Sequence, residues 1–95
     1  SGLVEAYVHA GRIGVLVELN CETDFVARTD EFKTLAHEIA LQVSSMNPKN
    51  TEELLDQEYI RDGSKTIQDL IKAAIAKLGE NIVLGRFSRI EIGRE

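Results

Sequence analysis

The side chains that could do chemistry in this 95-residue sequence are few, and none belongs to a catalytic motif. Cys21 is the only cysteine, and a cysteine thiolate can act as a nucleophile. His9 and His37 could transfer protons or bind a metal ion, but their separation fits no usual metal-ligand spacing. The simpler interpretation is a small core cysteine and a histidine on a helix surface. We therefore predict no catalytic residue, no metal site and no cofactor.

Three acidic residues, Glu18, Glu22 and Asp24, could form an acidic cluster. Alternation along a strand, followed by a turn, would point them in different directions, which favours a solvated edge. The sequence has no GxSxG, CxxC, HExxH or glycine-rich phosphate motif. One alternative remains open: a small-molecule-binding or enzymatic domain that uses Cys21, His9 and Glu18.

Residues 20–28 suggest contact with a partner rather than catalysis. This stretch joins an apolar β-branched run to an amphipathic segment, yet it carries two acids and the aromatic Phe25 instead of Gly or Pro. An acid beside an aromatic, as in Asp24-Phe25, is typical of a loop that contacts another protein. The alternative is that Phe25 packs under the following helix as a hydrophobic staple. The residues alone do not choose between these two interpretations.

Two strands should precede this stretch. Residues 3–9 alternate in polarity, Ala10-Gly11 predicts a tight turn with positive φ at Gly11, and residues 12–21 form a more apolar strand. The second strand has the composition of a central strand, with one fully apolar face: Ile13, Val15, Val17 and Leu19.

Two amphipathic helices should follow. The first starts after the N-cap residue Thr29 and ends at Asn47-Pro48, because the residue before proline avoids the α region. The second starts at Ser64 or Thr66, where Thr66 and Asp69 approximate a capping box, and ends at Gly79. Between them, residues 51–62 predict a short helical turn and then extended chain that ends in a turn at residues 62–63.

A third strand is predicted at residues 82–92, with Gly85 marking a bulge or a close backbone approach. Four apolar residues share one phase of this strand: Ile82, Leu84, Ile90 and Ile92. The predicted fold class is α+β, a two-layer sandwich whose three-stranded antiparallel sheet has the order strand, strand, helix, helix, strand. Both helices cover one face of the sheet, and the other face is left for a second copy or another domain.

The composition excludes several classes of partner. Eleven Lys and Arg against sixteen Asp and Glu give a net charge of −5, which argues against nucleic acid binding. The longest apolar run, Val15 to Val17, is far too short to cross a membrane. A lone cysteine favours a reducing compartment, and we expect a cytoplasmic protein. Because the sequence starts with Ser-Gly inside an alternating pattern, we expect a domain of a longer protein.

One long run makes the sequence similar to a known family. Residues 11–28, GRIGVLVELNCETDFVAR, closely resemble bacterial elongation factor Ts, as do residues 7–9, YVH, residues 73–83, AAIAKLGENIV, and Arg86-Phe87. The resemblance implies that residues 1–95 are the family's core, or dimerisation, domain. By the same resemblance, we expect that residues 1–95 do not include the family's N-terminal ubiquitin-associated-like domain. The stretch between Asn50 and Leu54 is much shorter than in most members, which carry additional helices there.

The resemblance also implies a function. The family binds elongation factor Tu, in its GDP-bound and nucleotide-free forms, and promotes guanine-nucleotide exchange during translation. Four residues would contact the partner and wedge into its GTPase domain near the Mg²⁺ and phosphate site: Thr23, Asp24, Phe25 and Val26. Longer members carry two copies of this unit, so the resemblance implies a homodimer formed through the uncovered sheet. The alternative is a structural dimerisation fragment without exchange activity of its own.

Overall fold

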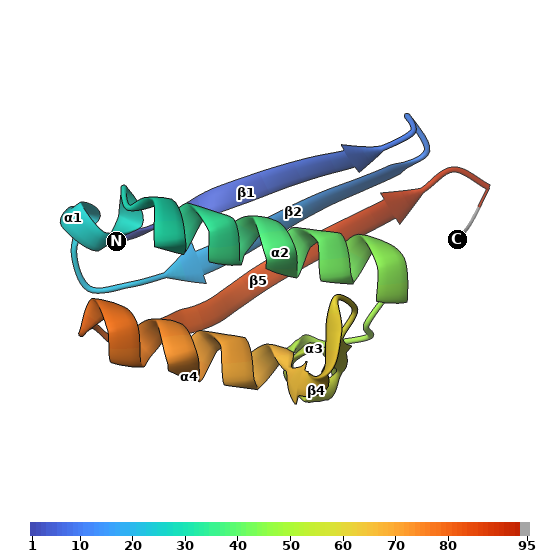
Figure 1. The fold of residues 1–95 in the computed structure, drawn as a ribbon. Helices are drawn as coiled ribbons and strands as arrows, with labels where there is room; N and C mark the ends of the chain where they lie inside the picture. Colours follow the sequence, from blue (N-terminus) through green and yellow to red (C-terminus); the bar gives the residue numbers. More distant parts are fainter. Residues whose placement is uncertain (94–95) are drawn as a thin grey trace.

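Three antiparallel strands form one layer of the structure, and helices form the other (Figure 1). The structure is a computed structural model that describes residues 1–93. The α+β fold class predicted from the sequence is confirmed, and the sheet has the order β1-β2-β5. The elements are β1 (Gly2–His9), β2 (Ile13–Asn20), α1 (Asp24–Ala27), α2 (Asp30–Met46), α3 (Thr51–Asp56), β3 (Glu58–Tyr59), β4 (Asp62–Thr66), α4 (Ile67–Leu78) and β5 (Val83–Glu91).

The first hairpin, β1 and β2, has the predicted turn with one unexpected residue. The backbone N–H of Arg12 donates to the His9 carbonyl over 2.9 Å, and φ is +52° at Ala10 and +67° at Gly11. Positive φ at both central residues matches the right-handed twist of the two strands, and the usual residues are Asn and Gly. Gly11 takes this conformation without a steric cost, whereas the Cβ of Ala10 is strained.

Replacing Ala10 by asparagine should therefore stabilise the protein by about 1 kcal/mol, because asparagine tolerates the left-handed conformation. The measurement is urea unfolding of both proteins at one protein concentration, with Ala10→Val as the opposite control. A β-branched residue is the least tolerant of positive φ, so Ala10→Val should destabilise the protein. Equal urea midpoints for all three proteins would contradict the inference that Ala10 is strained.

Local capping chemistry sets the ends of both long helices, as predicted. The Thr29 hydroxyl accepts from the Phe32 N–H at the start of α2, and Asn47 ends that helix at a φ of +48°. The Thr66 hydroxyl and the Asp69 carboxylate each accept from the other residue's backbone N–H, which completes the capping box of α4. Gly79 ends α4 with a φ of +76°.

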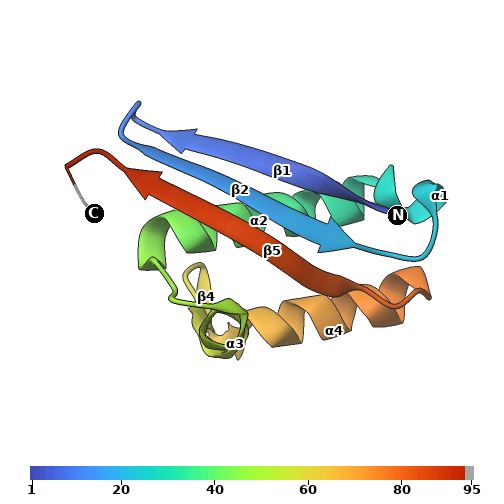
Figure 2. The ribbon, with the colours of Figure 1, turned by 180° about the vertical axis from the view of Figure 1, so that it is seen from behind.

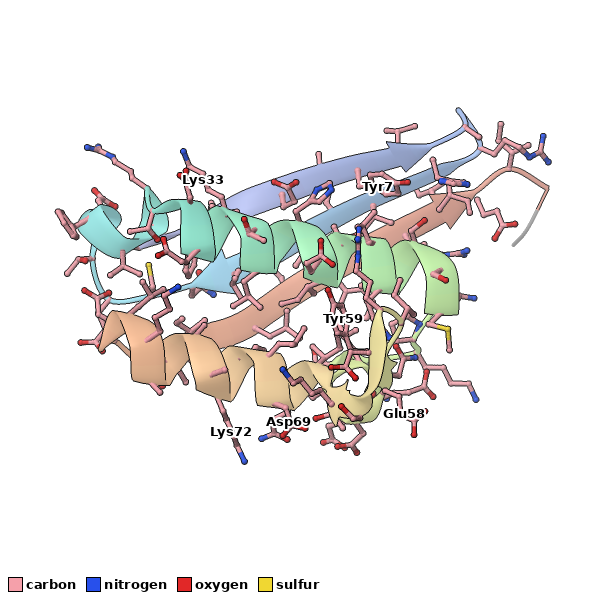
Figure 3. All side chains as sticks on the ribbon, in the orientation of Figure 1. Tyr7, Lys33, Glu58, Tyr59, Asp69 and Lys72 are labelled. Atoms are coloured by element: carbon pink, nitrogen blue, oxygen red, sulfur yellow. The ribbon has the colours of Figure 1, made fainter. Side chains whose placement is uncertain are left out.

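The segment between the long helices contains a second hairpin that the sequence did not predict. Asp62 and the following glycine lie inside β4, so the turn predicted at residues 62–63 is wrong, and residues 60–61 form the turn instead. The reason is tertiary: the fully buried Gln42 of α2 donates to the Glu58 carbonyl and accepts from the Ile60 N–H, both over 3.0 Å. The hairpin also places Tyr59 against α2 (Figure 3), where its hydroxyl donates to the Glu38 carboxylate. Burial and this carboxylate raise the pKa of Tyr59 to about 12.

A bulge in β5 makes the predicted phase of that strand wrong. Leu84 pairs with Leu19, but Phe87 pairs with Val17, so one extra residue lies on β5 between the two pairs. Residues 82 and 84 therefore face the core, whereas Ile90 lies on the opposite face and is exposed.

The bulge itself occurs where Gly85 predicted it. The Glu18 carboxylate accepts from the backbone N–H and from Nε of Arg86, both over 3.1 Å, and these bonds hold the pKa of Glu18 below its ordinary value. A Cβ at Gly85 would lie 2.7 Å from the same carboxylate oxygen. A close approach of this kind favours glycine, because a larger residue would push the Glu18 carboxylate away from its bonds to Arg86.

The two faces of the sheet differ in what covers them. α2 and α4 lie on one face and enclose a core that includes Val17, Leu19, Phe32 and Ile39. No helix covers the opposite face in the described part of the chain (Figure 2). Beside polar residues such as Glu18 and Arg86, that uncovered face carries five aliphatic side chains that are 51% to 74% exposed: Val4, Val8, Leu16, Val83 and Ile90. Among residues 1–93, no helix is both long enough and apolar enough to cross a membrane.

Candidate functional site

A single helical turn, α1, stands at the position where the sequence predicted a simple connection between β2 and α2. Thr23 has extended backbone angles and caps this turn, since its hydroxyl accepts from the Val26 N–H over 3.3 Å. At the other end, the Thr29 hydroxyl donates to the Val26 carbonyl over 2.7 Å while it also caps α2. Two threonine caps six residues apart therefore define where α1 begins and where α2 begins.

The four residues of α1 divide into a buried side and an exposed side. Val26 and Ala27 belong to the hydrophobic core, and Val26 is only 5% exposed. Phe25 is 81% exposed, the highest value of any large apolar side chain in residues 1–93, and Asp24 beside it is also exposed. The staple interpretation of Phe25 is therefore wrong, because the ring is exposed and its neighbour Val26 is the residue buried in the core. An isolated aromatic ring held in water next to an acid has the character of a binding anchor.

Glu80, in the connection between α4 and β5, holds the chain that leads into α1. One carboxylate oxygen accepts from the backbone N–H groups of Glu22 and Thr23, each over 3.1 Å. The other oxygen accepts from the Thr23 hydroxyl over 2.6 Å. In return, the Glu22 carboxylate accepts from the Asn81 N–H over 2.6 Å. We call these four bonds the Glu80 latch.

Sequence patterns did not predict the Glu80 latch. Glu80 and Asn81 follow the helix-ending Gly79 and resemble ordinary polar loop residues. Their partners lie 57 to 59 residues earlier in the chain, and the two segments become neighbours only because β2 and β5 pair. Figure 1 shows the result, with the C-terminal end of α4 beside the connection that leads to α1.

The structure does not bring together Cys21, His9 and Glu18, the residues of the alternative enzymatic interpretation. Cys21 follows β2 and His9 ends β1, so they lie at opposite ends of the first hairpin. Glu18 contacts Arg86 at the bulge. The Cys21 thiol donates to the Thr23 carbonyl over 3.2 Å, and burial raises its pKa, which disfavours the reactive thiolate.

The three acidic residues do not form a cluster with a shared role. Glu18 binds Arg86, Glu22 binds Asn81 and Asp24 is exposed on α1. Within residues 1–93, no three His, Cys, Asp or Glu side chains come together in a way that could hold a metal ion.

Comparison with known proteins identifies the family. The family model "Elongation factor TS" matches residues 22–95, which include α1 and the Glu80 latch. Elongation factor Ts of Coprothermobacter proteolyticus is 43% identical, and the match covers 97% of this chain and 70% of that protein. The proteins of the same name from Thermoanaerobacter pseudethanolicus and Thermotoga neapolitana are 43% and 41% identical, with 97% and 99% of this chain and 68% and 70% of theirs covered.

These alignments extend over 138 positions, more than the 95 residues of this chain, so the relatives carry additional residues within the matched region. The prediction of a shortened chain agrees with this difference. The relatives are elongation factors rather than enzymes, which accords with a site built from an exposed aromatic ring and backbone contacts. By the extent of the family match and the level of identity, the chain belongs to the elongation factor Ts family.

Proposed function

We propose that this chain promotes guanine-nucleotide exchange on elongation factor Tu, and that α1 is the part that enters the GTPase domain of that partner. Residues 1–95 would form the core, or dimerisation, domain of a cytoplasmic exchange factor. The observation that carries the proposal is the position of Phe25, 81% exposed on a helical turn whose other side is buried. A mobile loop could present the same residue, but it would lose affinity through the cost of ordering.

The physical basis of exchange needs no catalytic acid or base. A GTPase holds GDP largely through contacts with the phosphates and with Mg²⁺. A wedge that displaces the elements on the metal side removes part of that affinity. Binding is reciprocal. A protein that binds the nucleotide-free form more tightly than the GDP-bound form must weaken GDP binding by the same ratio.

The four residues predicted to bind the partner have separate roles in this proposal. Phe25 is the wedge, and Asp24 is exposed beside it, where its carboxylate can accept hydrogen bonds from the partner. Thr23 caps α1 and Val26 anchors it in the core, so these two contribute by holding the wedge in place.

We also propose that the protein is a homodimer formed through the uncovered face of the sheet. An antiparallel sheet with one solvated face normally carries polar residues on that face. Here that face presents five aliphatic side chains to water, as an interface would: Val4, Val8, Leu16, Val83 and Ile90. A two-fold arrangement would cover both copies at once, because the same face meets itself.

The test of exchange is the release of a fluorescent GDP analogue from elongation factor Tu, followed as this protein is added in increasing amounts. We expect the release rate to rise to a plateau and the effect to require only catalytic amounts of the protein. If the protein binds elongation factor Tu without accelerating release, the alternative is correct and the chain is a structural dimerisation fragment. Alkylation of Cys21 should leave exchange largely intact, whereas a thiol-dependent activity would be lost.

A further inference from the structure

We propose that Glu80 is a positioning residue, which holds α1 in its binding orientation before the partner arrives. The inference rests on the proposed function, because it assigns a role to a residue outside α1 in the same contact. It starts from the length of α1, which is four residues. A helix this short is far below the roughly 12 to 15 residues that an isolated helix needs in water, so other contacts must supply its order.

The Glu80 latch supplies that order through the cap of α1. A hydroxyl group has one proton to donate and can accept with its lone pairs. The Thr23 hydroxyl gives its proton to Glu80 over 2.6 Å and accepts from the Val26 N–H over 3.3 Å. Glu80 therefore fixes the direction in which the capping oxygen faces the helix.

The remaining bonds of the latch fix the backbone that leads into α1. Glu80 accepts from two consecutive N–H groups, at Glu22 and Thr23, with one carboxylate oxygen. Hydrogen bonds to an ionised acceptor are stronger than those between neutral groups. Asn81, bonded in turn to the Glu22 carboxylate, directly precedes the buried Ile82. Two sets of contacts therefore fix α1 to the rest of the protein: the burial of Val26 and the hydrogen bonds of the Glu80 latch.

This arrangement predicts a specific kinetic signature. If α1 is ordered for only part of the time, the apparent dissociation constant for elongation factor Tu equals the intrinsic constant divided by the ordered fraction. Once bound, Phe25 occupies the same place as before, and the maximal exchange rate is retained. Loss of Glu80 should thus raise the concentration needed for half-maximal exchange, whereas loss of Phe25 should lower the maximum itself.

The test compares Glu80→Ala and Glu80→Gln with Glu52→Ala, an exposed glutamate in the first turn of α3. We expect Glu80→Ala to raise the half-maximal concentration about 10-fold with a nearly unchanged maximal rate, and Glu52→Ala to change neither. Glu80→Gln keeps one carbonyl oxygen for the two N–H groups but loses the ionised acceptor, so its effect should be intermediate.

Amide hydrogen exchange provides a readout that does not depend on the release of GDP from elongation factor Tu. In Glu80→Ala, we expect faster exchange at the amides of Glu22, Thr23 and Val26, with unchanged protection in α2 and β2. Unchanged protection at these three amides, or an unchanged half-maximal concentration despite lost protection, would overturn the proposal. Absence of GDP release with the intact chain would refute the proposed function instead, while the amide measurement still tests the latch.

Discussion

Phe25→Ala is expected to lower the maximal rate of GDP release from elongation factor Tu by about 30-fold, which corresponds to about 2 kcal/mol. The reason is that Phe25 is the only large apolar group that α1 exposes, since Val26 and Ala27 are buried in the core. In the proposed mechanism, the ring makes its contacts as the metal side of the nucleotide site is displaced, so its loss lowers the maximal rate even at saturating protein. The measurement is the plateau rate of fluorescent GDP release at saturating protein.

Two control variants separate the wedge from general effects. Phe25→Leu keeps an apolar side chain at the same position and should retain part of the activity. Met46→Ala removes another half-exposed apolar side chain, from the far end of α2, and should have no effect on exchange. Because Phe25 is 81% exposed, its replacement should change the free energy of unfolding by less than about 0.5 kcal/mol. An unchanged plateau rate for a well-folded Phe25→Ala protein would exclude Phe25 as the wedge.

The parts of the fold that could be predicted from the sequence are those governed by local chemistry. The apolar residues of α2 recur with a helical period, and the hydroxyls of Thr29 and Thr66 bond to N–H groups only three residues away. Gly79 ends α4 because glycine adopts positive φ without cost. Each of these signals involves neighbours in the sequence, so periodicity and residue type were sufficient.

The features that the sequence did not predict depend on contacts between distant segments. The hairpin of β3 and β4 is held by Gln42, which lies 16 and 18 residues before the backbone groups that it binds. The change of face along β5 depends on the bulge at Gly85, where Glu18 binds a residue 68 positions later. Alternation alone placed Ile90 on the same face as Leu84, because periodicity cannot count a bulged residue.

In the candidate site, too, the features set by neighbouring residues differ from those set by contacts between distant segments. Its location could be predicted, because an acid and an aromatic stand where a connection is expected. The direction of Phe25 could not be predicted, since it follows from which neighbour fills the core, and Val26 does. Glu80 was not predicted at all, because its role exists only where two connections meet in space.

The two proposed contact surfaces lie on different parts of the molecule. α1 lies at one end of the molecule, on the side of α2, in both ribbon views (Figures 1 and 2). The apolar residues proposed for the dimer lie on the sheet face opposite the helices, as the strand register and their exposure indicate. A dimer formed through that face would leave both copies of α1 free to contact elongation factor Tu.

Leu16→Glu should convert the proposed dimer into a monomer. Leu16 lies on the uncovered face of the central strand, between Ala6 of β1 and Ser88 of β5, so a dimer would bury it near the middle of the interface. An unpaired charge buried there costs about 3 kcal/mol or more, and two-fold symmetry places two such charges in each interface. We therefore expect the dimer dissociation constant to rise at least about 100-fold. Sedimentation at micromolar concentration measures it, with Met46→Glu, a substitution away from the sheet, as the control that should remain dimeric. A monomeric parent protein at that concentration would refute the dimer, and a dimeric Leu16→Glu protein would place the interface elsewhere.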